Sequence, residues 1–79
     1  MAKYDINDDT VRPFRIYDAL EQSWLRWRYY SDSRRAHIGA LIEIRWAKVG
    51  TTFEVVDVST GKMIGQYRRG VNDIKFLKG

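Results

Sequence analysis

The stretch Phe53-Glu-Val-Val-Asp-Val-Ser-Thr-Gly-Lys-Met-Ile-Gly-Gln-Tyr67 decides the fold, because it has the pattern of a β-hairpin. Two runs rich in β-branched, aromatic and other apolar residues, 53–58 and 62–67, are separated by Ser59-Thr60-Gly61. A three-residue connection with glycine at the left-handed position is a common hairpin turn. The sequence therefore predicts two antiparallel strands here, with Gly61 in the left-handed conformation.

The same pattern predicts which side chains share a face of the sheet. Successive side chains of a strand point to opposite faces, so the position of the turn fixes the cross-strand neighbours. On one face of the sheet we expect Phe53 opposite Tyr67 and Val55 opposite Gly65. On the other face we expect Val56 and Ile64.

The segments on either side of this hairpin also suggest strands. Residues 70–72 include Gly70 and Asn72 and predict a turn, and residues 74–76 alternate in polarity as in a strand. Residues 42–46 alternate as well, with Ile, Ile and Trp at every second position, which favours a half-buried strand. The apolar residues of 41–49 also fit a helix closed by Gly50, so this alternative stays open.

Residues 18–30 are ambiguous between a helix and a strand. Asp18 and Glu21 have the spacing of a capping box, and the residues that follow Asp18 are good helix formers, so we favour a helix that begins there. Apolar residues at alternate positions of 25–29 instead suit a strand, which keeps this alternative open. A helix would present one apolar stripe, formed by Tyr17, Leu20, Trp24, Trp27 and Ser31.

The remaining segments define the predicted domain. Residues 1–12 are polar and acidic and read as a loose arm, while Pro13 marks a boundary before the single compact domain, 13–79. Residues 14–17 begin a helix or form an edge strand, and residues 31–39 read as a helix end and loop. The fold class we predict is α+β, with one helix packed on a four-stranded antiparallel β-meander. Its expected core contains Leu20, Trp24, Trp27, Ile42, Ile44, Phe53, Val55 and Tyr67.

The chain is mildly basic. Its 79 residues include 14 basic and 10 acidic side chains, for a net charge of +4. Acidic residues are interspersed among the basic ones, which disfavours a uniform phosphate-binding surface. Arginine outnumbers lysine, and arginine suits bidentate pairing and stacking rather than solubility alone. The composition therefore favours a specific contact.

The sequence lacks the patterns that identify an enzyme or a cofactor site. It has no cysteine, and its single histidine, His37, lies in a predicted loop and is expected to be solvated. Nucleophile, phosphate-loop and metal-ligand patterns are incomplete or missing. The absence of a long apolar stretch or signal-peptide core, together with the lack of cysteine, favours a cytoplasmic protein. We therefore expect no catalytic residue, cofactor or metal.

One segment has the composition of a binding surface. Residues 24–35 read Trp-Leu-Arg-Trp-Arg-Tyr-Tyr-Ser-Asp-Ser-Arg-Arg, and Trp, Tyr and Arg dominate interface hot spots. Trp24 and Trp27 have the spacing of core residues in a helix, so we assign them to the core. The predicted partner-binding residues are Arg26, Arg28, Tyr29, Tyr30, Arg34 and Arg35.

Three functions fit these residues. The first is a small non-enzymatic module that binds a protein or a protein–nucleic-acid complex; the second is a basic nucleic-acid-binding protein that uses an arginine and aromatic surface; the third is a self-associating structural subunit. In size and in its lack of chemical motifs the chain resembles small phage-encoded inhibitors, anti-CRISPR proteins among them, that block larger defence complexes. This resemblance covers no motif and implies no particular residues. Of these three functions, we favour binding to a protein partner.

Overall fold

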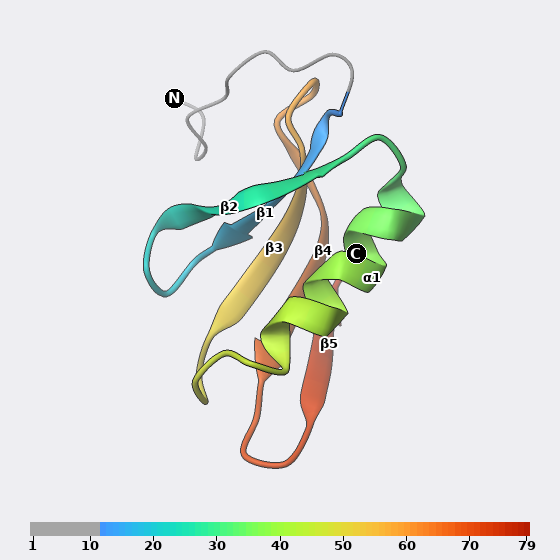
Figure 1. Cartoon of the computed structure of the whole chain (residues 1–79). Coiled ribbons are helices and arrows are strands. Elements are labelled where there is room, and N and C mark those ends of the chain that lie inside the picture. Colours follow the sequence, from blue (N-terminus) through green and yellow to red (C-terminus); the bar gives the residue numbers. More distant parts are fainter. Residues whose placement is uncertain (1–11) are drawn as a thin grey trace.

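A computed structural model describes residues 12–79 as an antiparallel five-stranded sheet with one helix across one face, an α+β fold (Figure 1). The predicted arm, residues 1–12, lies outside the described residues except for Arg12. The sheet has the strand order β2-β1-β3-β4-β5, so β2 and β5 are its edges. Along the chain the elements are β1 (Phe14–Asp18), β2 (Ser23–Tyr30), α1 (Ser33–Ile44), β3 (Thr52–Asp57), β4 (Lys62–Arg69) and β5 (Ile74–Lys78).

The connection through α1 explains why the sheet is not a simple meander. Strands β2 and β3 both pair with β1 and both run antiparallel to it, so they are parallel to each other. Parallel strands need a crossover, and α1 supplies it. The predicted four-stranded meander is therefore wrong in two places: residues 14–30 provide two extra strands, and the strand expected at 42–46 is the end of α1 and the turn after it.

The capping pattern at Asp18 belongs to a hairpin turn and not to the helix predicted over 18–30. Asp18 Oδ1 accepts hydrogen bonds from the backbone N–H groups of Leu20 and Glu21, at 3.0 and 3.1 Å. A carboxylate can make such bonds in a turn as well as at a helix start. The β-favouring Trp and Tyr residues that follow then pair with β1, so the strand alternative is correct.

Helix α1 begins in the segment that we expected to be a loop. The side chain of Asp32 caps it by accepting from Arg34 N at 3.1 Å. Ala36, Ala40 and Ile44, spaced four residues apart, are fully buried against the sheet. Small residues let the helix backbone approach closely: a Cβ at Gly39 would overlap the Tyr30 hydroxyl.

The central hairpin forms as predicted in most details. Phe53 pairs with Tyr67 and Val55 with Gly65, and the backbone of Gly61 has φ +73°. A bulge follows Val55, so Val56 pairs with Met63. The bulge leaves Ile64 on the helix side of the sheet, against the main core, and not on the face of Val56. The strand ends at Asp57, which makes the connection four residues long.

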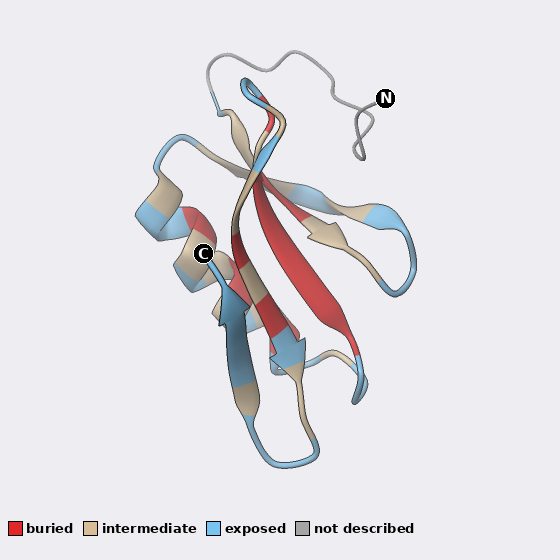
Figure 2. Ribbon diagram, turned by 180° about the vertical axis from the view of Figure 1, so that it is seen from behind, coloured by how far each residue is buried: buried red, intermediate tan, exposed pale blue. Residues whose placement is uncertain are grey.

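The core lies between α1 and the sheet, and half of the predicted core residues belong to it. Figure 2 shows β3 buried along nearly its whole length and β5 exposed. Leu20, Trp27 and Ile42 are exposed, and Trp24 packs on the opposite face of the sheet beside Val56. These four assignments assumed a helix over 18–30 and a strand over 42–46. The confirmed core residues are Ile44, Phe53, Val55 and Tyr67.

Candidate functional site

Trp27 is exposed because it lies in a bulge of the edge strand β2. Arg15 pairs with Tyr29 and Tyr17 with Trp24, so the single residue Ile16 lies opposite four residues of β2, 25–28. Extra residues in one strand bulge away from the partner strand. Trp27 lies in this bulge with φ +64° and 81% of its surface exposed.

The conformation of Trp27 is costly for the fold. A left-handed backbone costs a residue with a side chain about 1–2 kcal/mol, and such outliers in bulky residues are rare. The exposed indole recovers little of this cost by packing, since four-fifths of its surface is in contact with solvent. Strained residues of this kind concentrate at functional sites.

An ion pair joins β2, next to Trp27, to the end of α1, where a second indole is exposed. Arg28 Nη2 lies 3.1 Å from Glu43 Oε2, which joins β2 to α1, and Arg28 Nη1 donates to the backbone oxygen of Trp27 at 3.4 Å. Glu43 O accepts from the backbone N–H of Trp46 at 3.1 Å. Trp46, just beyond the end of α1, is 85% exposed, and half-exposed Ile42 lies four residues before it. We call Trp27, Arg28, Ile42, Glu43 and Trp46 the two-tryptophan surface.

The charges beside the two-tryptophan surface are mainly positive. Exposed arginines, Arg26 and Arg45, directly precede the two indoles in the sequence, whereas Arg28 is neutralised by Glu43. A second ion pair, Lys48 Nζ to Glu21 Oε1 at 3.4 Å, joins the loop after α1 to the β1–β2 turn. The surface therefore combines exposed rings with guanidinium groups, those of Arg26 and Arg45, that have no ion-pair partner within residues 12–79.

The six partner-binding residues predicted from the sequence do not form one surface. Arg28 belongs to the two-tryptophan surface and Arg26 adjoins it in the bulge. Tyr29 lies on the sheet face away from α1, and Tyr30 lies between β2 and α1 against Gly39. The other two, Arg34 and Arg35, are exposed in the first turn of α1.

Tyr30 takes part in packing. Its ring contacts the main core, and burial raises the pKa of its hydroxyl, an effect that Arg28 opposes and Glu43 reinforces. Tyr30 thus helps to hold β2 against α1, beneath the ion pair of the two-tryptophan surface.

The face of the sheet away from α1 carries a stack of rings around a buried guanidinium. The Arg15 guanidinium lies 4.8 Å from the Trp24 ring centre and 4.7 Å from that of Tyr29, and Arg15 is only 8% exposed. Tyr17 contacts Trp24 edge to face, with ring centres 5.1 Å apart. Cation–π and edge contacts of this kind stabilise packing, so these rings hold β1 to β2.

His37 also has a packing role instead of the solvated position we expected. Its Nδ1 lies 2.8 Å from the Tyr67 hydroxyl, which links α1 to β4. The ring occupies space that a Cβ at Gly65 would fill. Within residues 12–79, no group of three or more His, Cys, Asp or Glu side chains is placed to hold a metal ion. No helix in this part of the chain is long and apolar enough to cross a membrane.

Comparisons with models of known protein families, with curated proteins and with solved structures found no match to this chain.

The sequence pattern did not identify Trp46 and Ile42 as surface residues. Both fall on a regular apolar stripe, which normally marks a buried face. The competing signal was the spacing of Ala36, Ala40 and Ile44, a row of small and apolar residues suited to close helix–sheet packing. Taking that row as the buried side of a helix would have placed Ile42 and Trp46 outside.

Proposed function

We propose that this protein is a small non-enzymatic binding module that docks on a larger protein through the two-tryptophan surface. The observation that carries the proposal is Trp27: its indole is exposed, and its left-handed backbone costs the folded state free energy that the packing of the ring does not recover. Trp46, whose backbone N–H donates to the backbone oxygen of Glu43 in the Arg28–Glu43 ion pair, provides a second exposed ring.

The chemistry of this surface matches a protein interface. Trp and Arg are enriched among the residues that contribute most to protein association, because large rings lose much water-exposed area at little entropic cost. Arg26 and Arg45 provide charges at its edge, and the Arg28–Glu43 pair supplies hydrogen-bonding groups near its centre. We expect a partner with apolar side chains surrounded by carboxylates. Blocking a larger complex, as the phage-encoded inhibitors of similar size do, is one way in which such a module would act.

Nucleic-acid binding is the second candidate, favoured by the ring and arginine stack on the other face of the sheet. Bases bind proteins by stacking on free aromatic faces next to phosphate-pairing cations. In this stack, however, Arg15 already occupies faces of Trp24 and Tyr29, and Tyr17 contacts Trp24. Trp27 and Trp46 are more available, so the protein partner is preferred. Self-association would bring the arginines of two copies together, which disfavours a homodimer through this surface.

The test compares capture of partners from the source cell by three proteins, each with and without nuclease treatment. These are the wild type, the Trp27→Ala/Trp46→Ala variant, and the control Leu77→Ala, which removes a partly exposed apolar side chain from β5 at the opposite edge of the sheet. We expect a protein that survives nuclease to be recovered by the wild type and the control and lost with the double variant.

Two results would contradict the proposal. Equal recovery by all three proteins would remove the two-tryptophan surface from the interface. Recovery that depends on nucleic acid, together with affinity for plain oligonucleotides that falls steeply with salt, would favour the nucleic-acid function. Circular dichroism of each variant separates loss of binding from loss of folding.

A further inference from the structure

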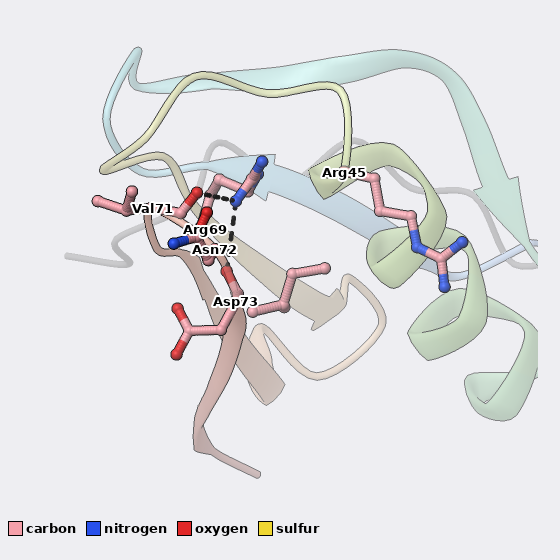
Figure 3. Close-up of a pocket in the computed structure, with 6 residues that line it drawn as sticks. Arg45, Arg69, Val71, Asn72 and Asp73 are labelled. Atoms are coloured by element: carbon pink, nitrogen blue, oxygen red, sulfur yellow. Dashed lines mark hydrogen bonds between the residues drawn. The ribbon is translucent and has the colours of Figure 1, made fainter.

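A pocket of about 380 Å³ lies between the end of α1 and the β4–β5 turn, away from the β2 edge of the sheet. Its lining combines two arginines with an acid, an amide and two apolar side chains: Arg45, Arg69, Asp73, Asn72, Val71 and Ile74. Figure 3 shows Arg45, from the end of the helix, and Arg69, from the end of β4, on opposite sides of this space. Its volume is in the range of small-ligand sites.

The turn holds Arg69 in place. Its Nη1 donates to the backbone oxygen of Gly70 and lies 3.5 Å from those of Val71 and Asp73. The Nε atom of the same guanidinium is buried and has no acceptor among residues 12–79. A guanidinium fixed in this way loses little conformational entropy when it binds an anion.

The pocket has an excess of positive charge. Within the described residues, no carboxylate lies within ion-pair distance of Arg45 or Arg69. Asp73 is the only acid in the lining, so the lining carries two guanidinium charges and one carboxylate. One additional negative charge would balance the pocket, whereas a doubly charged phosphate would be repelled by Asp73.

We propose that this pocket binds a monocarboxylate with a short branched apolar body. The carboxylate pairs with the fixed Arg69 guanidinium, and the exposed Arg45 side chain turns toward it from the other side of the space, because arginine pairs with planar carboxylates through charge-assisted hydrogen bonds. Val71 and Ile74 contact the apolar body, and Asn72 offers an amide. This inference rests on the pocket alone and not on the proposed protein interface, although one lining residue, Arg45, directly precedes Trp46 and is also an edge charge of the two-tryptophan surface.

Two sources offer this chemistry: a free small acid, and the C-terminal residue of another polypeptide. We would titrate ¹⁵N-labelled full-length protein with 4-methylpentanoate for the first source and with N-acetyl-leucine for the second. N-acetyl-leucinamide is the matched control without the charge, and sodium chloride at equal ionic strength controls for screening. The readout is the shift of the backbone signals of 70–74 and of the Arg Nε–H groups.

We expect saturable shifts with a Kd of about 1 mM or tighter for at least one acid, and none with the amide or the salt. Stronger binding of N-acetyl-leucine indicates a chain terminus as the ligand, and stronger binding of 4-methylpentanoate indicates a free acid. Arg45→Gln should weaken binding about tenfold, the effect of losing one charge-assisted contact. Arg35→Gln, an exposed arginine in the first turn of the same helix, should leave it unchanged.

The proposal is overturned if neither acid gives saturable shifts, if the amide or chloride gives the same shifts, or if Arg35→Gln weakens binding as much as Arg45→Gln. Binding that persists unchanged in Arg45→Gln overturns it too. Backbone spectra of both variants confirm that each one is folded. The titration uses no captured partner and is read at residues 70–74, so its outcome is distinguishable from that of the test on Trp27 and Trp46.

Discussion

Replacing Trp27 with glycine should leave the fold nearly as stable as the wild type. The left-handed backbone of Trp27, φ +64°, costs about 1–2 kcal/mol that glycine does not incur. Against this gain, glycine adds about 0.5–1 kcal/mol of entropy to the unfolded chain. The indole is 81% exposed, so the fifth that is hidden corresponds to about 50 Å² of a large ring and about 1 kcal/mol of burial. The three contributions nearly cancel.

Urea unfolding followed by circular dichroism measures the outcome. We expect the free energy of unfolding of Trp27→Gly to lie within about 1 kcal/mol of the wild-type value, a change of less than about 8 °C in melting temperature. Trp27→Ala keeps the strained backbone and loses the ring, so it should be the less stable variant by several tenths of a kcal/mol.

A loss of about 3–5 kcal/mol in both variants would refute this reasoning, because that is the cost of removing a buried large ring. An alanine variant more stable than the glycine variant would show that the backbone of residue 27 is not left-handed in solution. Either result would also remove the main support for the two-tryptophan surface.

Three further predictions concern packing, turn and titration. Gly39→Ala should destabilise the protein despite a gain of about 1 kcal/mol in helix propensity, because its Cβ displaces the Tyr30 ring; a melting point above that of the wild type would contradict the close approach. At φ +73°, Gly61→Val should lower stability by about 1–2 kcal/mol and Gly61→Asn by much less, and equal losses in denaturant melts would contradict the turn. Burial raises the pKa of Tyr67 above its usual value near 10, so the stability it confers is present below pH 10 and is lost as pH rises through the folded-state pKa. The melting temperature of Tyr67→Phe should therefore fall less than that of the wild type between pH 9 and 12. Equal falls in the two proteins would exclude a contribution of Tyr67 ionisation to the pH dependence.

The parts of the fold that the sequence predicted correctly are those specified by neighbouring residues. The central hairpin follows from two β-favouring runs and a glycine turn, all within fifteen residues. Residues 18–30 were misassigned because the Asp18 carboxylate caps a turn with the same hydrogen bonds that begin a helix. Residues 23–30 form a strand by pairing with β1, and β1 is held in the sheet by β3, which lies more than thirty residues away along the chain.

The candidate surface was predictable only in part, for a similar reason. The sequence named Arg26 and Arg28 as candidates because they lie in a segment dense in rings and guanidinium groups, the composition of interfaces. It placed Trp27 inside because periodicity alone cannot reveal a bulge, and the bulge exists only when β2 is aligned with β1. The role of Trp46 depends on which side of α1 faces the sheet, and that is a tertiary property.

The bulge in β2 has a consequence for solubility. A sheet edge offers unpaired backbone groups to other chains, and an aromatic-rich edge strand is a risk for growth into intermolecular sheets. The four residues opposite Ile16 break the straight row of donors and acceptors along β2, so a second chain cannot align with its full length. The other edge, β5, carries Lys75 and Lys78, whose charges repel a copy of itself. The irregularity that exposes Trp27 thus also keeps this edge from pairing with another chain along its full length.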